Sequence, residues 1–250
     1  MTGPGDADPI QAPGTDEALW RAWDGWAELS EAALPRGPVV VVAAHPDDEV
    51  LGAGGALALL AAAGQPLTVV TVTDGEGSHP RTRVLRPPAL AARRAVELRA
   101  ALARLGASAA RTVRLRVPDT AVAAHEDEVR RALVPLTAGA ALVLAPWTGD
   151  VHADHEATGR AARAAARETG APSAAYPVWM WHWARPGDPR VPWHRAKRLD
   201  LPADVRARKR EAVACFRSQI APLGPAPEDA AILPPAELAH HVRDFEVWFA

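Results

Sequence analysis

Short apolar runs alternate along this chain with longer segments in which alanine, leucine and charged residues recur at helical spacing. Residues 39–44 form an uncharged run of valine and alanine, which is typical of a strand buried on both faces. Similar runs recur further on, most of them followed by a helical pattern. The alternation predicts an α/β fold: a single-domain, Rossmann-like, three-layer structure with a mostly parallel sheet covered on both sides.

The pattern also places the individual elements. Strands are expected at residues 39–44, 67–73, 112–117, 142–145 and 197–201, and helices at residues 50–63, 89–105, 126–136, 155–168 and 204–218. Residues 174–183 read as an extended aromatic segment and residues 186–192 as a loop. From residue 222 onward the chain is rich in proline and then weakly helical.

The beginning of the chain has a different character. Residues 1–14 are rich in Gly, Pro and Asp and are expected to form a flexible tail, which leaves residues 15–250 as the domain. Thr15 can cap a helix with an apolar stripe, which favours docking on the core over binding a partner helix. The stripe consists of Leu19, Trp20, Trp23, Trp26 and Leu29.

Composition narrows the classes of partner. The 250 residues carry a formal net charge of −2, so no basic surface for nucleic acid or for an anionic membrane is expected. No run of about 20 apolar residues could cross a membrane, and the first residues do not resemble a secretory signal. The single cysteine, Cys215, excludes an internal disulfide and fits a cytoplasmic protein. The composition leaves open whether the chain forms a homo-oligomer.

Two groups of polar residues follow two of the apolar strands. Ala44-His45-Pro46-Asp47-Asp48-Glu49 stands at the end of the first strand, which is where α/β enzymes place their ligands. His152-Ala153-Asp154-His155 follows the strand at residues 142–145. In the first group an imidazole and one carboxylate can bind a cation together, while the neighbouring carboxylate stays free to move protons.

His45, Asp48 and His155 together make the three-ligand set of a catalytic zinc site, which leaves a fourth position for water. The alternative is that His45 is a structural histidine and that the two aspartates only cap the following helix. Because both groups occur at equivalent strand ends, the metal site is favoured. Other divalent transition metals suit the same donors.

Both groups resemble the two signatures of the PIG-L/LmbE-like zinc deacetylases, a family that hydrolyses N-acetyl groups on glucosamine-containing substrates. The resemblance spans residues 38–220. It includes Thr73-Asp74-Gly75-Glu76, the segment from Arg94 to Glu97, Ala145-Pro146-Trp147 and the stretch from Lys209 to Gln219.

The resemblance implies a role for each residue of the two groups. His45, Asp48 and His155 would bind zinc, Asp47 would be the general base, and His152 would steady the oxyanion while Asp154 orients its imidazole. The resemblance also implies that Asp119 contacts a substrate hydroxyl. The family's substrate-binding arginine follows the Thr-Asp-Gly-Glu turn, where Arg81, Arg83 and Arg86 are the candidates.

The residue types support the same chemistry without the family. Zinc lowers the pKa of its bound water toward ~7 and polarises a carbonyl group. Asp47 can take the water's proton and pass it to the leaving amine. A protonated His152, its pKa raised by Asp154, would stabilise the oxyanion.

Other features have simpler explanations. The spacing of Gly52-Ala53-Gly54-Gly55 does not fit a dinucleotide fingerprint and favours close packing of a helix on the sheet. Arg94 and Glu97 read as a pair on one helix. Five histidines are expected at the surface: His79, His125, His194, His240 and His241.

The tryptophans around residues 179–183 allow two interpretations. They could form a wall on which a sugar stacks, to which Trp147 and Trp181 would contribute, or one packed face of a strand.

The sequence therefore predicts a metal-dependent N-deacetylase acting on a small molecule that carries an N-acylated aminosugar. Two alternatives remain. One is an amidase that removes a larger acyl group from a glucosaminyl-inositol thiol conjugate, and the other is a sugar-binding relative without activity.

Overall fold

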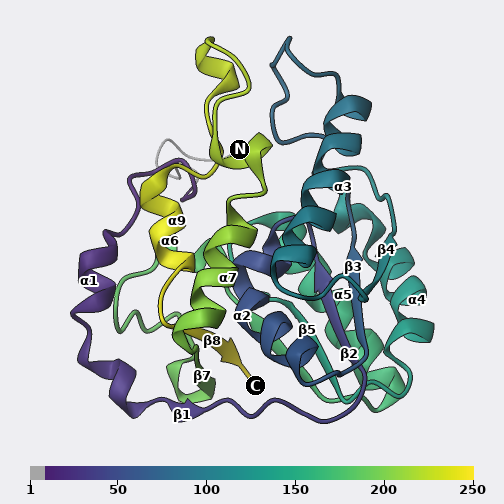
Figure 1. Ribbon diagram of the computed structural model, residues 1–250, viewed down its shortest axis with the longest axis vertical. Helices are drawn as coiled ribbons and strands as arrows, with labels where there is room; N and C mark the ends of the chain where they lie inside the picture. Colours follow the sequence, from purple (N-terminus) through teal and green to yellow (C-terminus); the bar gives the residue numbers. More distant parts are fainter. Residues whose placement is uncertain (1–8) are drawn as a thin grey trace, which may run out of the picture.

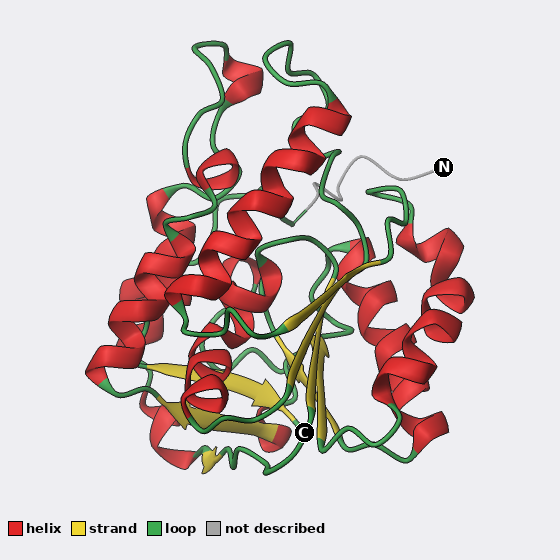
Figure 2. Ribbon diagram, turned by 45° about the vertical axis from the view of Figure 1, so that its right-hand side comes forward, coloured by secondary structure: helices red, strands yellow, loops and turns green. Residues whose placement is uncertain are grey.

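A twisted sheet with helices on both faces forms the body of the chain (Figures 1 and 2). The computed structural model describes residues 9–250, so residues 1–8 of the expected tail lie outside the described part. The eight described strands are β1 Ser30–Glu31, β2 Val39–Ala43, β3 Leu67–Thr71, β4 Arg111–Arg114, β5 Leu142–Pro146, β6 Ser173–Tyr176, β7 Ala196–Asp200 and β8 Phe245–Phe249.

The helices of the described residues connect these strands. The α-helices are α1 Glu17–Arg21, α2 Asp48–Ala62, α3 Pro87–Arg104, α4 Glu126–Thr137, α5 Ala153–Thr169, α6 Met180–Trp183, α7 Ala203–Val213, α8 Arg217–Ile220 and α9 Pro235–His241. Short 3-10 helices are η1 Asp24–Glu28, η2 Val122–His125, η3 Trp193–Arg195 and η4 Pro227–Asp229.

The order of the strands places β2 at the centre of the sheet. The order is β1-β7-β8-β6-β5-β2-β3-β4, and the described strands pair in parallel except for β8, which is antiparallel to both β6 and β7. From β2 the chain runs outward through β3 and β4 and then returns to β5 on the other side. The switch point between β2 and β5 is where open α/β sheets form a ligand crevice. The predicted fold class is confirmed.

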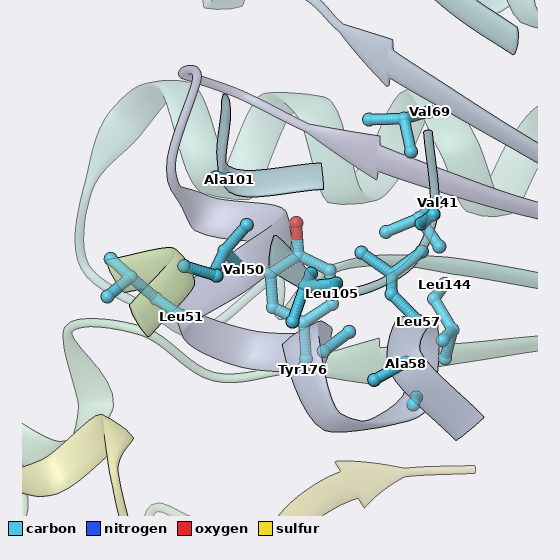
Figure 3. Close-up of a cluster of buried hydrophobic side chains, with 14 of the residues drawn as sticks. Val41, Val50, Leu51, Leu57, Ala58, Val69, Ala101, Leu105, Leu144 and Tyr176 are labelled. Atoms are coloured by element: carbon cyan, nitrogen blue, oxygen red, sulfur yellow. The ribbon is translucent and has the colours of Figure 1, made fainter. Parts of the chain in front are cut away.

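Alternating side chains of β2 supply the two sides of the sheet, as the period of a strand requires. Val39 and Val41 belong to the core cluster that also contains residues of α2, α3 and α7. Val40 and Val42 belong to the cluster that contains residues of α4 and α5. In the first cluster Val41 lies close to Leu57 (Figure 3).

Helix α2 is kinked at Ala53, where φ is −142° and ψ is 18°. A buried ion pair satisfies the backbone groups beside the kink. Lys209 Nζ donates to Leu51 O at 2.9 Å, and Glu246 accepts from the N–H groups of Gly55 at 2.6 Å and Ala56 at 3.1 Å. Lys209 and Glu246 also pair with each other at 2.6 Å, so each of the two buried charges has a partner of opposite sign.

The glycines of α2 are needed for close packing. A Cβ atom on Gly52 would lie 2.0 Å from the ring of Tyr176, and one on Gly55 would lie 2.4 Å from Leu201. The close-packing explanation of this glycine-rich run is therefore confirmed.

Several predicted elements were wrong. Residues 180–183 form the helical turn α6 rather than extended chain, and residues 245–249 form the unpredicted antiparallel strand β8. The N-terminal stripe divides into α1 and η1, because Trp23 between them is extended. Asp16 caps α1 through its side chain, whereas Thr15 Oγ1 donates to Ala184 O at 2.6 Å.

Residues 9–14 of the expected tail include a contact with the domain. Ala12 O accepts a hydrogen bond from His182 Nε2 at 2.8 Å, so residues of the described part of the expected tail lie against α6. The division into tail and domain stays a prediction. Within residues 9–250, no helix combines the length and the apolar character that crossing a bilayer requires.

A buried cluster joins α1 to α9. Glu17 accepts hydrogen bonds from His240 Nδ1 at 2.7 Å and from Arg243 Nη2 at 2.6 Å. The Arg243 guanidinium lies 4.3 Å from the centre of the Trp181 ring. Burial raises the pKa of Glu17, but the hydrogen bonds from His240 and Arg243 outweigh it and lower that pKa from 4.5 to about 2.

This cluster gives a testable pH dependence. Because the folded-state pKa of Glu17 lies below its unfolded value, its stabilisation is present above pH 4.5 and is lost as the pH falls toward 2. We expect Glu17→Gln to lower the free energy of unfolding by about 2–3 kcal/mol at pH 7, and by progressively less below pH 4.5. Denaturant unfolding across this range measures the effect, with the exposed substitution Glu31→Gln as control. If the loss of unfolding free energy caused by Glu17→Gln does not change with pH, the lowered pKa of Glu17 is contradicted.

Candidate metal centre and active site

The two predicted signature groups meet at the carboxyl ends of neighbouring strands. His45 lies just after β2, and Asp48 is the first residue of α2. His152 is the N-cap residue of α5, which follows β5, and His155 lies in its first turn. Since β2 and β5 are adjacent and parallel, both groups reach the same edge of the sheet (Figure 1).

Three donor groups converge there, all buried. His45 Nδ1 lies 3.3 Å from His155 Nε2 and 3.4 Å from Asp48 Oδ2, and His155 Nε2 lies 3.3 Å from Asp48 Oδ1. Tetrahedral coordination with bonds of about 2.0–2.1 Å places neighbouring ligand atoms about 3.3–3.4 Å apart. The separations and the donor types therefore fit a metal ion of zinc's size. A ring nitrogen of His152 also lies within 4.8 Å of those of the other two histidines.

Each predicted histidine ligand is held by carboxylates on its other side. His155 Nδ1 lies 2.7 Å from Asp150 Oδ2, and His45 Nε2 lies 3.1 Å from Asp119 Oδ1 and 3.3 Å from Asp154 Oδ2. Such outer carboxylates fix the ring orientation and tautomer of metal-binding histidines.

Asp150 was missed by the sequence reasoning. It is fully buried and accepts hydrogen bonds from the backbone N–H groups of Val178, Trp179 and Met180, so the start of α6 holds its carboxylate in place. The sequence feature that could have pointed to Asp150 is its place in the loop after β5, two residues before His152.

The carboxylates favour positive charge at this place. Burial lowers the pKa of His155, but Asp48 and Asp150 outweigh it and raise that pKa to about 9. Burial raises the pKa of Asp48, yet the nearby His155 and His45 hold it well below its usual range. A divalent cation would supply the positive charge that these acids attract.

Asp47 lies beside the three donors and lines the same cavity. Its Oδ1 pairs with Arg94 Nη2 at 3.0 Å. Burial raises the pKa of Asp47 to about 6, with Asp48 adding to the shift and Arg94 opposing it. The carboxyl group can therefore exchange a proton near neutral pH.

His152 and Asp154 are arranged differently from the prediction. The Asp154 carboxylate accepts from the N–H groups of Thr120 and Val122 and contacts His45, while the Asp154 N–H donates to His152 Nδ1 at 3.3 Å. Burial, together with the charges on His155 and His45, lowers the pKa of His152 to about 3. The structure thus favours a neutral His152 that carries its proton on Nε2 and donates from there.

The loops of the site adopt uncommon backbone conformations. Among the four described non-glycine residues with positive φ, Asp47, Thr120 and Val151 directly adjoin the site, with φ of 153°, 70° and 71°. Such conformations cost on the order of 1–3 kcal/mol each and persist where the surrounding structure holds them.

A cavity of about 670 Å³ opens over the donor groups. Arg81 and Asp119 line it, and their contacts with a substrate stay a prediction. Trp179 and His182 of the α6 turn also contribute to its wall, together with residues 230–234 near the C-terminus.

Arg83, Trp147 and Trp181, which were also predicted to contact the substrate, do not line this cavity of the described structure. Trp147 lines a separate pocket of about 80 Å³. Because residues 180–183 are helical, Trp179 faces the cavity whereas Trp181 packs into the tryptophan cluster beside Trp20. Arg83 is exposed.

Three of the five histidines expected at the surface are buried: His79, His240 and His241. His79 lines the cavity, and its Nε2 lies 3.1 Å from Ala230 O. The pairing of Arg94 with Glu97 is also wrong, since Arg94 contacts Asp47 and Glu97 accepts from Ser218.

Comparison with known proteins places this site in a family. Residues 40–166, which are 127 of the 250, match the family described as PIG-L, GlcNAc-PI de-N-acetylase. The chain belongs to the PIG-L family. The predicted resemblance is thereby confirmed.

Among curated proteins, the chain is 46% identical over 84 residues to a 1D-myo-inositol 2-acetamido-2-deoxy-alpha-D-glucopyranoside deacetylase of Actinosynnema mirum. That match covers 31% of this chain and 29% of the relative. The chain thus aligns with less than a third of the length of the curated relatives it matches.

Solved structures share the fold over a longer range. A conserved protein from Thermus thermophilus is 27% identical with a TM-score of 0.54, covering 73% of this chain and 80% of that one. The N,N'-diacetylchitobiose deacetylase from Pyrococcus horikoshii is 22% identical with a TM-score of 0.57, covering 80% and 75%.

The role of Asp150 can be tested through metal affinity. Asp150→Asn keeps the shape of the side chain but removes the charge that faces His155 Nδ1. We expect affinity for Zn²⁺ to fall about 10–100-fold, the usual effect of losing such an outer partner. Competition with a chromophoric chelator measures this affinity. The exposed substitution Asp127→Asn serves as control, and equal affinities for the two variants contradict the role.

Proposed function

We propose that this protein is a zinc-dependent hydrolase that removes the N-acetyl group from a glucosamine-containing small molecule. The observation that carries the proposal is the placement of His45, Asp48 and His155 at mutual distances of 3.3–3.4 Å, with Asp47 beside them in one cavity. Membership of the PIG-L family and the deacetylase activity named for the Actinosynnema mirum relative support this substrate class.

His45, Asp48 and His155 are the proposed metal ligands. Zinc bound there would supply a Lewis acid that polarises the amide carbonyl and makes water acidic enough to react near neutral pH. The ion's identity rests on the donor set, which other transition metals also suit.

Asp47 is the proposed general base and acid. Its carboxylate takes a proton from the attacking water, which bonds to the carbonyl carbon. When the C–N bond breaks, Asp47 returns the proton to the nitrogen, so that a neutral amine leaves and acetic acid is the other product, which then ionises to acetate in water. Without that proton the nitrogen would leave as an anion, which is a very poor leaving group.

His152 is proposed to stabilise the oxyanion as a neutral donor. Because its Nδ1 accepts from the Asp154 N–H, the proton on Nε2 is available to the negatively charged oxygen. Loss of one oxyanion donor costs about 2.7–4 kcal/mol in comparable enzymes. Asp154, in this proposal, acts on His152 through its backbone and on His45 through its carboxylate.

Two alternatives from the sequence remain. The cavity of about 670 Å³ is in the range of sites for drug-sized ligands, so an amidase acting on a larger acyl group has room for its substrate. A binding protein without activity is disfavoured, because Asp47 and His152 both line the cavity. Cytoplasmic location and homo-oligomer formation stay predictions.

A panel of substrates tests the function. We expect zinc-loaded protein to release acetate and a free amine from at least one N-acetylglucosaminide, such as an N-acetylglucosaminyl-inositol. Matched compounds with longer acyl chains test the amidase alternative, and the dialysed metal-free protein is the control. If the protein binds the sugars but releases no acid from any of them, the alternative of a sugar-binding relative without activity is supported instead.

A pair of substitutions separates the base from the ligands. We expect Asp47→Asn to keep about one metal ion per chain and to lower kcat by at least about 100-fold, since proton transfer contributes 10²–10⁴-fold. We expect His155→Ala to lose the metal and the activity together. Elemental analysis and acetate release measure both effects. Hydrolysis by Asp47→Asn at the parent rate would show that another group is the base.

A further inference from the structure

Arg94 of α3 reaches across two loops at the active edge of the sheet. Its side chain is 3% exposed. Nη2 donates to Pro46 O at 2.9 Å and pairs with Asp47 Oδ1 at 3.0 Å, while Nη1 donates to Gly75 O at 3.0 Å. One guanidinium therefore joins the loop after β2 to the loop after β3.

The turn that carries Asp47 requires such support. Its φ of 153° and ψ of −30° lie in a region that favours glycine. A non-glycine residue keeps this conformation where its surroundings hold it. Arg94 contacts both the side chain of Asp47 and the carbonyl that precedes it, so it restrains the turn on two sides.

The loop after β3 is built to admit the guanidinium. Gly75 has a φ of +67°, and a Cβ atom at this position would lie 2.2 Å from Arg94 Nη1. Any larger residue would therefore displace the guanidinium from Asp47.

Glu97 does not compete for Arg94, although it stands one helical turn away. It accepts from Ser218 N at 2.9 Å and from Ser218 Oγ at 2.6 Å, and its remaining helix partner is Arg93 at 3.1 Å. The carboxylate that pairs with Arg94 is that of Asp47.

We propose that Arg94 is a positioning residue that holds the carboxylate of Asp47, and the turn that carries it, in the geometry needed for proton transfer. The proposal rests on the function proposed above for Asp47. Because Oδ1 is paired with Arg94, Oδ2 is the oxygen that exchanges the proton with water and with the leaving nitrogen.

Kinetics of matched variants test the proposal. We expect Arg94→Ala to lower kcat about 100-fold, which is the cost of misplacing a reacting group by about 1 Å, with KM changed less than about threefold and zinc content unchanged. Arg93→Ala is the control, because Arg93 stands next to Arg94 on α3 but has a side chain that is 43% exposed. Added guanidinium ion should restore part of the kcat of Arg94→Ala and leave Arg93→Ala unaffected. A kcat within twofold of the control, or a loss confined to KM, would overturn the proposal.

A second readout does not depend on activity. The unfolding temperature is measured for the parent, Arg94→Met, Asp47→Asn and the double variant, all loaded with zinc. We expect Arg94→Met to lower it several degrees more when residue 47 is Asp than when it is Asn, because the charged pair is lost only in the first case. Equal reductions in the two backgrounds would overturn the coupling between the residues. If no substrate is hydrolysed, the proposed function fails while this cycle still decides whether Arg94 holds Asp47.

Discussion

The meeting of two imidazoles and a carboxylate at the edge between β2 and β5 is the constraint on which the rest of the site depends. His45 and His155 lie 110 residues apart in the sequence, and the parallel register of the two strands brings their ring nitrogens to 3.3 Å. Buried carboxylates face both rings, and burying so many charged groups is unfavourable unless they are paired. A cation at this point would neutralise acids that the fold has already gathered.

Helix α2 links this site to the hydrophobic core. Its first residue, Asp48, is a proposed ligand, and its later turns pack between the sheet and α7. Close approach to Tyr176 requires Gly52, and Tyr176 in turn donates to Val42 O at 2.7 Å. The Lys209–Glu246 pair satisfies the backbone groups beside the kink, which lies between the ligand-bearing end of the helix and its later turns.

The acids of the site divide into two groups by their partners. Asp119, Asp150 and Asp154 face the imidazoles and are themselves held by backbone N–H groups from other loops. Asp47 is paired instead with Arg94. This separation keeps the carboxylate proposed to move protons apart from those that orient the histidines. Identical functional groups thus take different roles because their neighbours differ.

The sequence by itself determined the alternation of strands and helices from β2 to α5, the mostly parallel sheet and both signature groups, because strand periodicity and metal-ligand types are local signals. It did not reveal Asp150 or the partner of Arg94, and it misplaced Trp181, because each depends on contacts between distant segments. The predicted helix pair of Arg94 and Glu97 was broken by Asp47 and Ser218, which lie outside α3. Only the tertiary structure could decide these roles, since the charge nearest in sequence is not the charge nearest in space.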